Sequence, residues 1–228
     1  VLLGVDYSQV ELRIVAHMAD DQAMLQAFLN DQDIHATTAA AVAGIKLDEV
    51  QPAQRRHAKA INFGLIYGMS AFGLTRTTDL TLAEAEDFVE AYFKQFPGVK
   101  EFLDDLRKQA QEQEYVETLL GRRRYFPGLS TQSNVNTRNR QLREAINAPI
   151  QGTAADIMKK AMLDVAEALA ASDLDARMLL QVHDELVLEC HQDDLEAAAT
   201  LVKEKMSQAY TLKVPLRTDA RAGVNWGK

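Results

Sequence analysis

Two cations and two aromatic rings recur at every fourth residue in one stretch of the chain. The set consists of Arg55, Lys59, Phe63 and Tyr67. At about 3.6 residues per turn they form one ridge along a helix, which we predict over residues 52–68. A ridge with a cationic end and an aromatic end suits a ligand with phosphates at one end and a flat ring at the other, that is, a nucleotide. A half-buried helix whose cations are merely solvated fits the same pattern equally well.

Three carboxylates lie at the ends of stretches that we expect to be strands. Asp6 follows an apolar run, and Asp184 and Glu185 lie between the two apolar arms of a predicted hairpin over residues 177–190. Taken singly, an Asp after a strand favours a helix cap, and acids in a hairpin favour ordinary turn chemistry. Adjacent carboxylates between buried strands are costly, however, unless a cation lies beside them.

If the fold brings these carboxylates together, they form an acidic site that offers oxygen ligands only. Mg²⁺ prefers such a site, because it keeps several waters and binds one or two carboxylates together with substrate phosphates. Two such ions about 4 Å apart stabilise the attacking and leaving oxygens of a phosphoryl transfer. The helix over residues 52–68 would supply the cations that the remaining phosphates need.

A second ridge, made of polar side chains, is predicted on a later helix. It consists of Arg143, Asn147 and Gln151, again spaced by four residues. Fork-shaped and amide side chains can read base edges or sugars, and a solvated helix face explains them as well. We expect the helix that carries them to be interrupted at Pro149.

The charge is unevenly distributed along the 228 residues. A net charge of −8 argues against a general nucleic-acid binder. Residues 51–78 and 118–143, however, contain no Asp or Glu, and they hold four and six of the 25 basic residues. Solvated faces normally mix both signs. The two windows therefore indicate a polyanion that contacts only part of the surface.

The composition excludes several classes of protein. Hydrophobic residues make up 47% and charged residues 25% of the chain, which is typical of a globular protein. The sequence shows neither an apolar run of about 18 residues nor the pattern of a signal peptide. We therefore expect no membrane segment and a cytoplasmic location. Cys190 is the single cysteine, which excludes an internal disulfide and a cysteine-based zinc site. The chain starts within an apparent strand and without Met, so we expect a piece of a longer protein.

The order of the predicted elements indicates an α+β fold. Strands are expected at both ends of the chain, and an arginine-rich hairpin at residues 115–125. The middle is mainly helical, with helices expected at residues 21–30, 34–43, 52–68, 81–95, 99–113 and 139–170.

Three motifs follow one another in a fixed order. The first is Asp6-Tyr-Ser-Gln-Val-Glu11-Leu-Arg13, the second is Arg55-x3-Lys59-x3-Phe63-Gly-x2-Tyr67-Gly68, and the third is Val182-His-Asp184-Glu185. In order and spacing they resemble the first palm motif, the fingers helix and the second palm motif of the family A DNA polymerases, the bacterial DNA polymerase I type. The resemblance extends over essentially all 228 residues.

The resemblance implies a template-directed DNA polymerase of replication and repair. Such an enzyme transfers a nucleotide from a dNTP to a primer 3′-hydroxyl with two Mg²⁺ ions. Asp6, Asp184 and the Tyr7 carbonyl are then metal ligands, Glu185 is a supporting acid, and Lys59 protonates the leaving pyrophosphate. We expect primer-template DNA and dNTPs as partners. We also expect a monomer that does not associate with a membrane.

The resemblance also assigns binding roles. Arg55, Lys59 and His35 would hold the triphosphate, Phe63 would pack on the sugar and base, and Tyr67 would lie beside the template base. Glu11 would exclude a 2′-hydroxyl. Gln9 would belong to the same nucleotide site. The primer and template would be contacted by Arg143, Asn147, Gln151 and His183.

By the same resemblance, an antiparallel palm sheet is joined to a mainly helical fingers subdomain. The palm would comprise residues 1–34 and 161–228, and the fingers residues 35–160. The family's thumb and exonuclease domains have no counterpart in the sequence, so we expect little processive synthesis by these residues alone.

Three other functions compete with this one. The chain could be a binding module for nucleotide or DNA that lacks catalysis, which nucleotide incorporation would distinguish. A single-subunit RNA polymerase shares the spacing from lysine to tyrosine, but Glu11 and the sequence Asn62-Phe63-Gly64 disfavour it. A structural helical domain with incidental acids disagrees with the acid-free windows.

Overall fold

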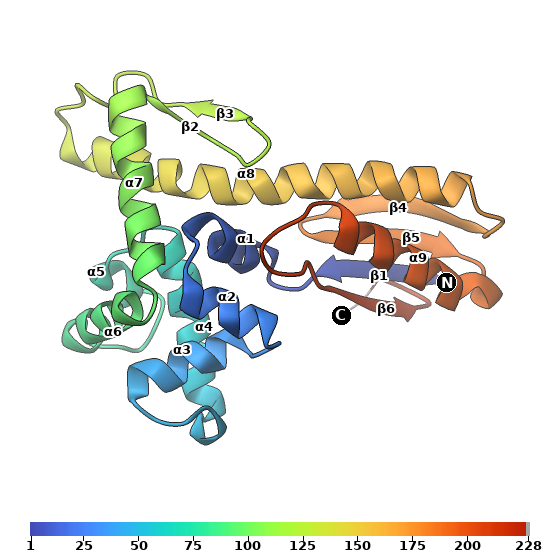
Figure 1. Ribbon diagram of the computed structural model, residues 1–228, viewed down its shortest axis with the longest axis horizontal. Helices are drawn as coiled ribbons and strands as arrows, with labels where there is room; N and C mark the ends of the chain where they lie inside the picture. Colours follow the sequence, from blue (N-terminus) through green and yellow to red (C-terminus); the bar gives the residue numbers. More distant parts are fainter. Residues whose placement is uncertain (227–228) are drawn as a thin grey trace. The chain divides into compact units, whose positions relative to one another are not determined.

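The computed structural model describes residues 1–226 (Figure 1). The chain forms two compact units, one made of Val1–Ile14 and Thr153–Lys228 and the other of Val15–Gly152. The first unit contains an antiparallel sheet and the second is mainly helical. The predicted α+β class is therefore confirmed.

The sheet of the first unit has four antiparallel strands in the order β4-β5-β1-β6. The strands are β1 (Leu2–Tyr7), β4 (Ala176–Val182), β5 (Glu185–Cys190) and β6 (Thr218–Gly223). Strand β1 lies in the centre, with Asp6 opposite Glu185 on β5 and opposite Asp219 on β6. This register gathers residues from both ends of the sequence at one end of the sheet.

Alternation along the strands explains why one face of this sheet is buried. Leu3 and Val5 on β1, and Leu186 and Leu188 on β5, are almost completely buried, as expected for side chains that share one face. Helix α9 (Leu195–Gln208) packs on β1 and β6 (Figure 1). The Tyr7 hydroxyl donates a hydrogen bond of 2.7 Å to the Met206 carbonyl, which fixes that helix on the sheet.

The second unit is built from six helices that lie wholly within residues 15–152, two of which are capped by aspartates. Asp21 caps α2 by accepting from the Met24 N–H, and it also accepts from the Gly98 N–H at the start of α7. Asp33 caps α3 in the same way. The helices that lie wholly within the second unit are α2 (Gln22–Leu29), α3 (Ile34–Ala43), α4 (Pro52–Ile66), α5 (Ala71–Leu74), α6 (Leu82–Gln95) and α7 (Pro97–Gln113).

The remaining elements are two further helices, a small hairpin and two 3-10 turns. Helices α1 (Val10–Ala19) and α8 (Val135–Ala170) each have residues in both units. The hairpin pairs β2 (Tyr115–Glu117) with β3 (Arg123–Tyr125), as predicted. The 3-10 turns are η1 (Leu47–Glu49) and η2 (Gln192–Asp194). Within residues 1–226, none of the helices is both long and apolar enough to pass through a membrane.

Helix α8 runs without interruption through Pro149, so the break predicted there is wrong. A proline inside a helix removes one main-chain hydrogen bond and costs about 3 kcal/mol. The neighbouring Ala145, Ile146 and Ile150 are buried, and each large apolar side chain contributes roughly 1.5–3 kcal/mol when buried. Packing on both sides of the proline therefore outweighs the lost hydrogen bond.

Candidate active site

The first unit brings the predicted carboxylates together. Asp6 faces Glu185 across the β1–β5 pair, and the Tyr7 N–H donates to the Asp184 carbonyl at 3.0 Å. A cavity of about 340 Å³ opens at this end of the sheet. It is lined by Asp6, Val182, His183, Asp184, Glu185, Arg221 and Trp226. Asp6, Asp184, Glu185 and His183, which were predicted from separate motifs, therefore share one cavity.

Asp6 lies in an environment that opposes its negative charge. Burial raises the pKa of Asp6, the Arg221 guanidinium lowers it, and the carboxylates of Asp184, Glu185 and Asp219 raise it further. The net shift is upward. A cation placed at this end of the sheet would relieve both the burial and the repulsion.

Glu185 differs from the two aspartates, because the protein already neutralises it. Its side chain is buried and accepts from Arg221 at 2.6 Å and from the Trp226 indole N–H at 3.4 Å. Gly4 lies beneath it, since a Cβ at that position would stand 2.3 Å from Glu185 Oε1. Sequence reasoning missed Gly4, Arg221 and Trp226, although the cost of two adjacent buried acids predicted that some cation would lie there.

The residues at this cavity suit a cation that is only partly bound by protein. Within the described part of the chain, no three His, Cys, Asp or Glu side chains are grouped so as to enclose a metal ion. The donors are instead carboxylate oxygens in an open cavity. Mg²⁺ favours this arrangement, because it retains waters and binds substrate phosphates together with one or two carboxylates.

In the second unit, α4 presents the predicted ridge on its partly exposed side. Lys59 is exposed, Arg55, Phe63 and Tyr67 are half-buried, and the opposite side of the helix is buried. The Phe63 ring lies 6.3 Å from the Tyr67 ring and 5.8 Å from the His35 ring, centre to centre. Tyr67 itself is the C-cap of α4 rather than part of the helix.

An acid that the sequence did not single out holds the cationic end of the ridge. Asp33 accepts from the Arg55 guanidinium at 2.5 Å. Burial disfavours its charged form, but the hydrogen bonds from Arg55 and from the Ala36 and His35 main-chain N–H groups lower the pKa of Asp33 overall. Its position before α3 marks it as a helix cap, and nothing in the sequence pairs it with Arg55.

His35 lies buried beside the ridge and is neutral at pH 7. Burial lowers its pKa to about 4, with Asp33 opposing the shift and Arg55 and Lys59 adding to it. The Asn62 side chain contacts the ring from the buried side of α4, with 3.1 Å between Asn62 Nδ2 and His35 Nδ1. Sequence reasoning missed Asn62. Its signal in the sequence is that it is a polar residue on the face of the predicted helix that should be buried.

The polar ridge on α8 meets the C-terminal end of α4. The Asn147 amide faces the main-chain carbonyls of Tyr67 and Arg143, and it donates to them at 3.2 and 3.3 Å when its NH₂ group points toward them. Gly68 is in close contact with the same helix, since a Cβ there would lie 2.9 Å from Ile146 Cδ1. Gln151, the third member of the ridge, is exposed.

The other predicted residues lie in the first and third motifs. Gln9 has a left-handed main chain with φ of 55° immediately before α1, and Glu11 lies in the first turn of that helix. His183 has the same unusual φ of 55° at the tip of the β4–β5 hairpin, where its carbonyl accepts from Gln181 at 2.6 Å.

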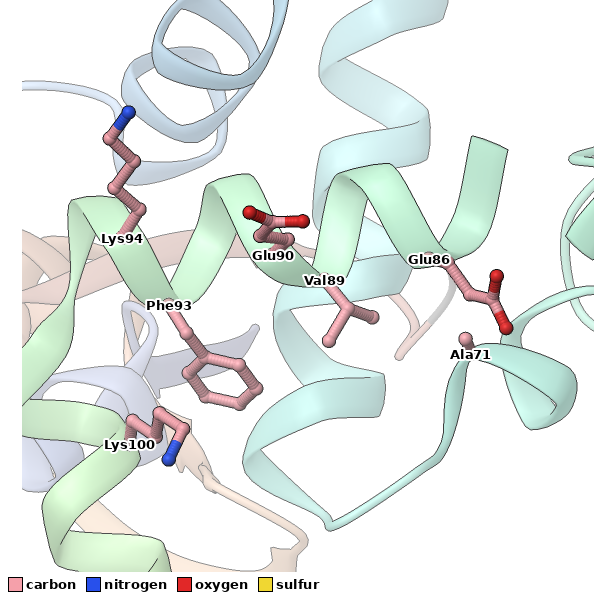
Figure 2. Close-up of a pocket in the computed structure, with 7 residues that line it drawn as sticks. All are labelled: Ala71, Glu86, Val89, Glu90, Phe93, Lys94 and Lys100. Atoms are coloured by element: carbon pink, nitrogen blue, oxygen red, sulfur yellow. The ribbon is translucent and has the colours of Figure 1, made fainter. Parts of the chain in front are cut away.

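A second cavity, of about 510 Å³, lies between α5, α6 and α7. Figure 2 shows Val89 and Phe93 projecting from the same side of α6. Two acids and two lysines surround these apolar side chains: Glu86, Glu90, Lys94 and Lys100. Because its two acids and two lysines leave no excess of one charge, this cavity is a poor candidate for the site of a reaction on phosphates.

Comparisons with known proteins identify the family. The family model described as DNA polymerase family A matches residues 1–228. The chain is 52% identical over 225 residues to a DNA polymerase I of Pseudomonas aeruginosa and 47% identical over 226 residues to that of Bacillus caldotenax. It covers 24% and 26% of those proteins, and each match includes 99% of the chain.

A solved structure resembles this chain over most of the length of the chain. It is the "POL domain of Pol1 from M. smegmatis complex with DNA primer-template and dNTP", with a TM-score of 0.91 and 43% identity. The match includes 96% of this chain and 38% of that one. The chain thus spans about a quarter of the length of the curated relatives it matches. It belongs to DNA polymerase family A.

Proposed function

We propose that the protein carrying this chain is a template-directed DNA polymerase that transfers a nucleotidyl unit from a dNTP to a primer 3′-hydroxyl. The observation that carries the proposal is the β1–β5 register, which places Asp6 and Asp184 in one cavity. The similar solved structure, described as holding primer-template and dNTP, supports the same substrates.

Two Mg²⁺ ions would be held by the carboxylates of Asp6 and Asp184 and by the Tyr7 carbonyl. Bound there, the ions would stabilise the attacking and leaving oxygens. The unfavourable burial and repulsion at Asp6 are what such cations relieve. Glu185 would act indirectly, because its charge is paired with Arg221 and its second oxygen accepts from the Trp226 indole N–H.

The triphosphate would be bound by Arg55, Lys59 and His35. Arg55 is held in place by Asp33, so it would contact phosphate from a fixed position. His35 is neutral and would bind phosphate as a hydrogen-bond donor rather than as a charge. Lys59 is exposed and would protonate the leaving pyrophosphate.

The rest of the nucleotide would be bound by rings and by the first motif. Phe63 would pack on the sugar and base, and Tyr67 would lie beside the template base. Glu11 would exclude a 2′-hydroxyl, with Gln9 in the same site. The primer and template would be contacted by Arg143, Asn147, Gln151 and His183.

The assignment of subdomains is part of the proposal. The palm would comprise residues 1–34 and 161–228, and the fingers residues 35–160. We further propose a monomeric, cytoplasmic enzyme. The competing function is a module that binds nucleotide and DNA without catalysis.

Primer extension with purified protein tests the proposal. Asp6→Ala and Asp184→Ala should each reduce incorporation roughly a thousandfold, since each removes a carboxylate that would hold the Mg²⁺ ions that stabilise the transition-state charge. The control Asp193→Ala removes an exposed aspartate on η2, away from the cavity, and should leave the rate unchanged. Magnesium-dependent incorporation would support the polymerase, whereas binding of DNA and dNTP without incorporation would support the binding module.

A further inference from the structure

Three buried polar side chains form a continuous chain behind the aromatic end of α4. Thr38, Asn62 and His35 are each at most 2% exposed. Asn62 Nδ2 lies 3.1 Å from Thr38 Oγ1 and 3.1 Å from His35 Nδ1. All three belong to the helical unit, on α3 and α4.

The Thr38 hydroxyl fixes the orientation of the Asn62 amide. Thr38 Oγ1 donates its one hydrogen to the Ile34 carbonyl at 2.8 Å, one helical turn back. Toward Asn62 it therefore offers only a lone pair and requires a donor. The NH₂ group of Asn62, not its oxygen, must point to Thr38.

The same amide then fixes the position of the proton on His35. With one N–H on Thr38, the second N–H of Asn62 points to His35 Nδ1. That nitrogen must accept, so the ring proton resides on Nε2. Reversing the amide would place two lone pairs together at Thr38 and keep one hydrogen bond instead of two.

We propose that Thr38 and Asn62 are positioning residues that hold His35 as the Nε2–H tautomer, so that its ring donates a neutral hydrogen bond to a triphosphate oxygen. This inference rests on the proposed function for the identity of the acceptor, but not for the tautomer itself. The opposite tautomer would present a lone pair to an anionic oxygen and repel it.

Two further features of the site agree with this role. Asn62 Oδ1 is buried and has no hydrogen-bond partner among residues 1–226. The amide is therefore oriented by the acceptors on Thr38 and His35 and not by a partner for its own oxygen. Burial and the nearby cations Arg55 and Lys59 outweigh Asp33 and keep the ring neutral at physiological pH. A neutral ring has one proton to place, so its tautomer decides whether Nε2 donates.

Magic-angle-spinning ¹⁵N NMR of histidine-labelled protein measures the tautomer without nucleotide, and the His35→Gln variant assigns the signals. We expect the wild-type ring to show an unprotonated Nδ1 and a protonated Nε2. Thr38→Val keeps the branched shape but removes the acceptor, so both tautomers should appear. Thr38→Ser restores the hydroxyl and should restore the single Nε2–H form. An Nδ1–H signal in the wild type, or a Thr38→Val spectrum identical to that of the wild type, would overturn the inference.

Nucleotide binding separates this inference from the proposed function. The apparent Kd for dNTP should rise roughly ten- to a hundredfold in His35→Ala, which removes a hydrogen bond to a charged group. A smaller rise is expected in Thr38→Val and none in Thr38→Ser. Thermal unfolding of each variant confirms that it is folded. If His35→Ala binds dNTP like the wild type while the tautomer is as expected, the triphosphate contact is refuted but the roles of Thr38 and Asn62 in the tautomer stand.

Discussion

Gly4 on β1 provides the space that the Glu185 carboxylate occupies on β5. A Cβ at Gly4 would lie 2.3 Å from Glu185 Oε1, the same oxygen that accepts from Arg221. Glu185 is buried there, with 5% of its surface exposed. The missing side chain at Gly4 is therefore a requirement of the acidic cavity and not only of the strand.

Gly4→Ala should push the Glu185 carboxylate away from Arg221. We expect the free energy of unfolding to fall by roughly 1–3 kcal/mol, which is typical of forcing extra volume into a packed site. Urea denaturation measures it. The control is a double-mutant cycle with Glu185→Ala, in which the added methyl group meets no carboxylate. An equal loss in both backgrounds would show that the strand, not Glu185, requires the glycine.

His35 should make the protein less stable in mild acid. Its pKa is about 4 in the folded protein and 6.5 as the ordinary value, so the unfolded state binds the proton first. Stability is therefore fully present above pH 6.5 and decreases as the pH falls toward 4. The total loss is up to about 3 kcal/mol.

Chemical denaturation at several pH values measures that loss. His35→Gln should show a flatter profile between pH 6.5 and 4, because it has no ring to protonate. His57→Gln, at a half-buried histidine on α4, is the matched control. A wild-type profile that His35→Gln leaves unchanged would contradict the prediction.

The sequence predicted the elements well because their signals are local. The Thr81 side chain caps the start of α6, and a run of apolar residues marks β1. The α8 break at Pro149 was predicted wrongly, because tertiary packing of Ile146 and Ile150 overrides a local rule.

The candidate site could be predicted only in part. Asp6 and Asp184 were identified because each lies at or just beyond the end of a strand, within a recognisable motif. Arg221 and Asp33 were missed, because a long-range ion pair leaves no pattern in the sequence near either partner. The orientation of Asn62 depends on the Thr38 hydroxyl, which only the three-dimensional contacts reveal.

Magnesium should stabilise the folded protein through the carboxylates of the cavity. A ligand that binds only the folded state raises the unfolding free energy by about 2.7 kcal/mol at one hundred times its Kd. We expect added Mg²⁺ to raise the Tm of the wild type and EDTA to reverse the rise. Asp6→Asn and Asp184→Asn should each lose most of the effect, whereas Asp193→Asn should retain it. Equal Mg²⁺ responses in all variants would place the ion elsewhere.

Pro149→Ala should stabilise α8 without changing its polar ridge. The alanine restores the main-chain N–H that can bond to the Ala145 carbonyl, and it removes the proline ring from the helix interior. The unfolded chain becomes more flexible, which offsets roughly 0.4–1 kcal/mol of the gain. We expect a net increase of about 2 kcal/mol in the free energy of unfolding, measured by urea denaturation. Affinity for primer-template should stay the same, because Arg143, Asn147 and Gln151 already lie on one continuous helix. A loss of stability would show instead that α8 depends on the rigid proline at this position.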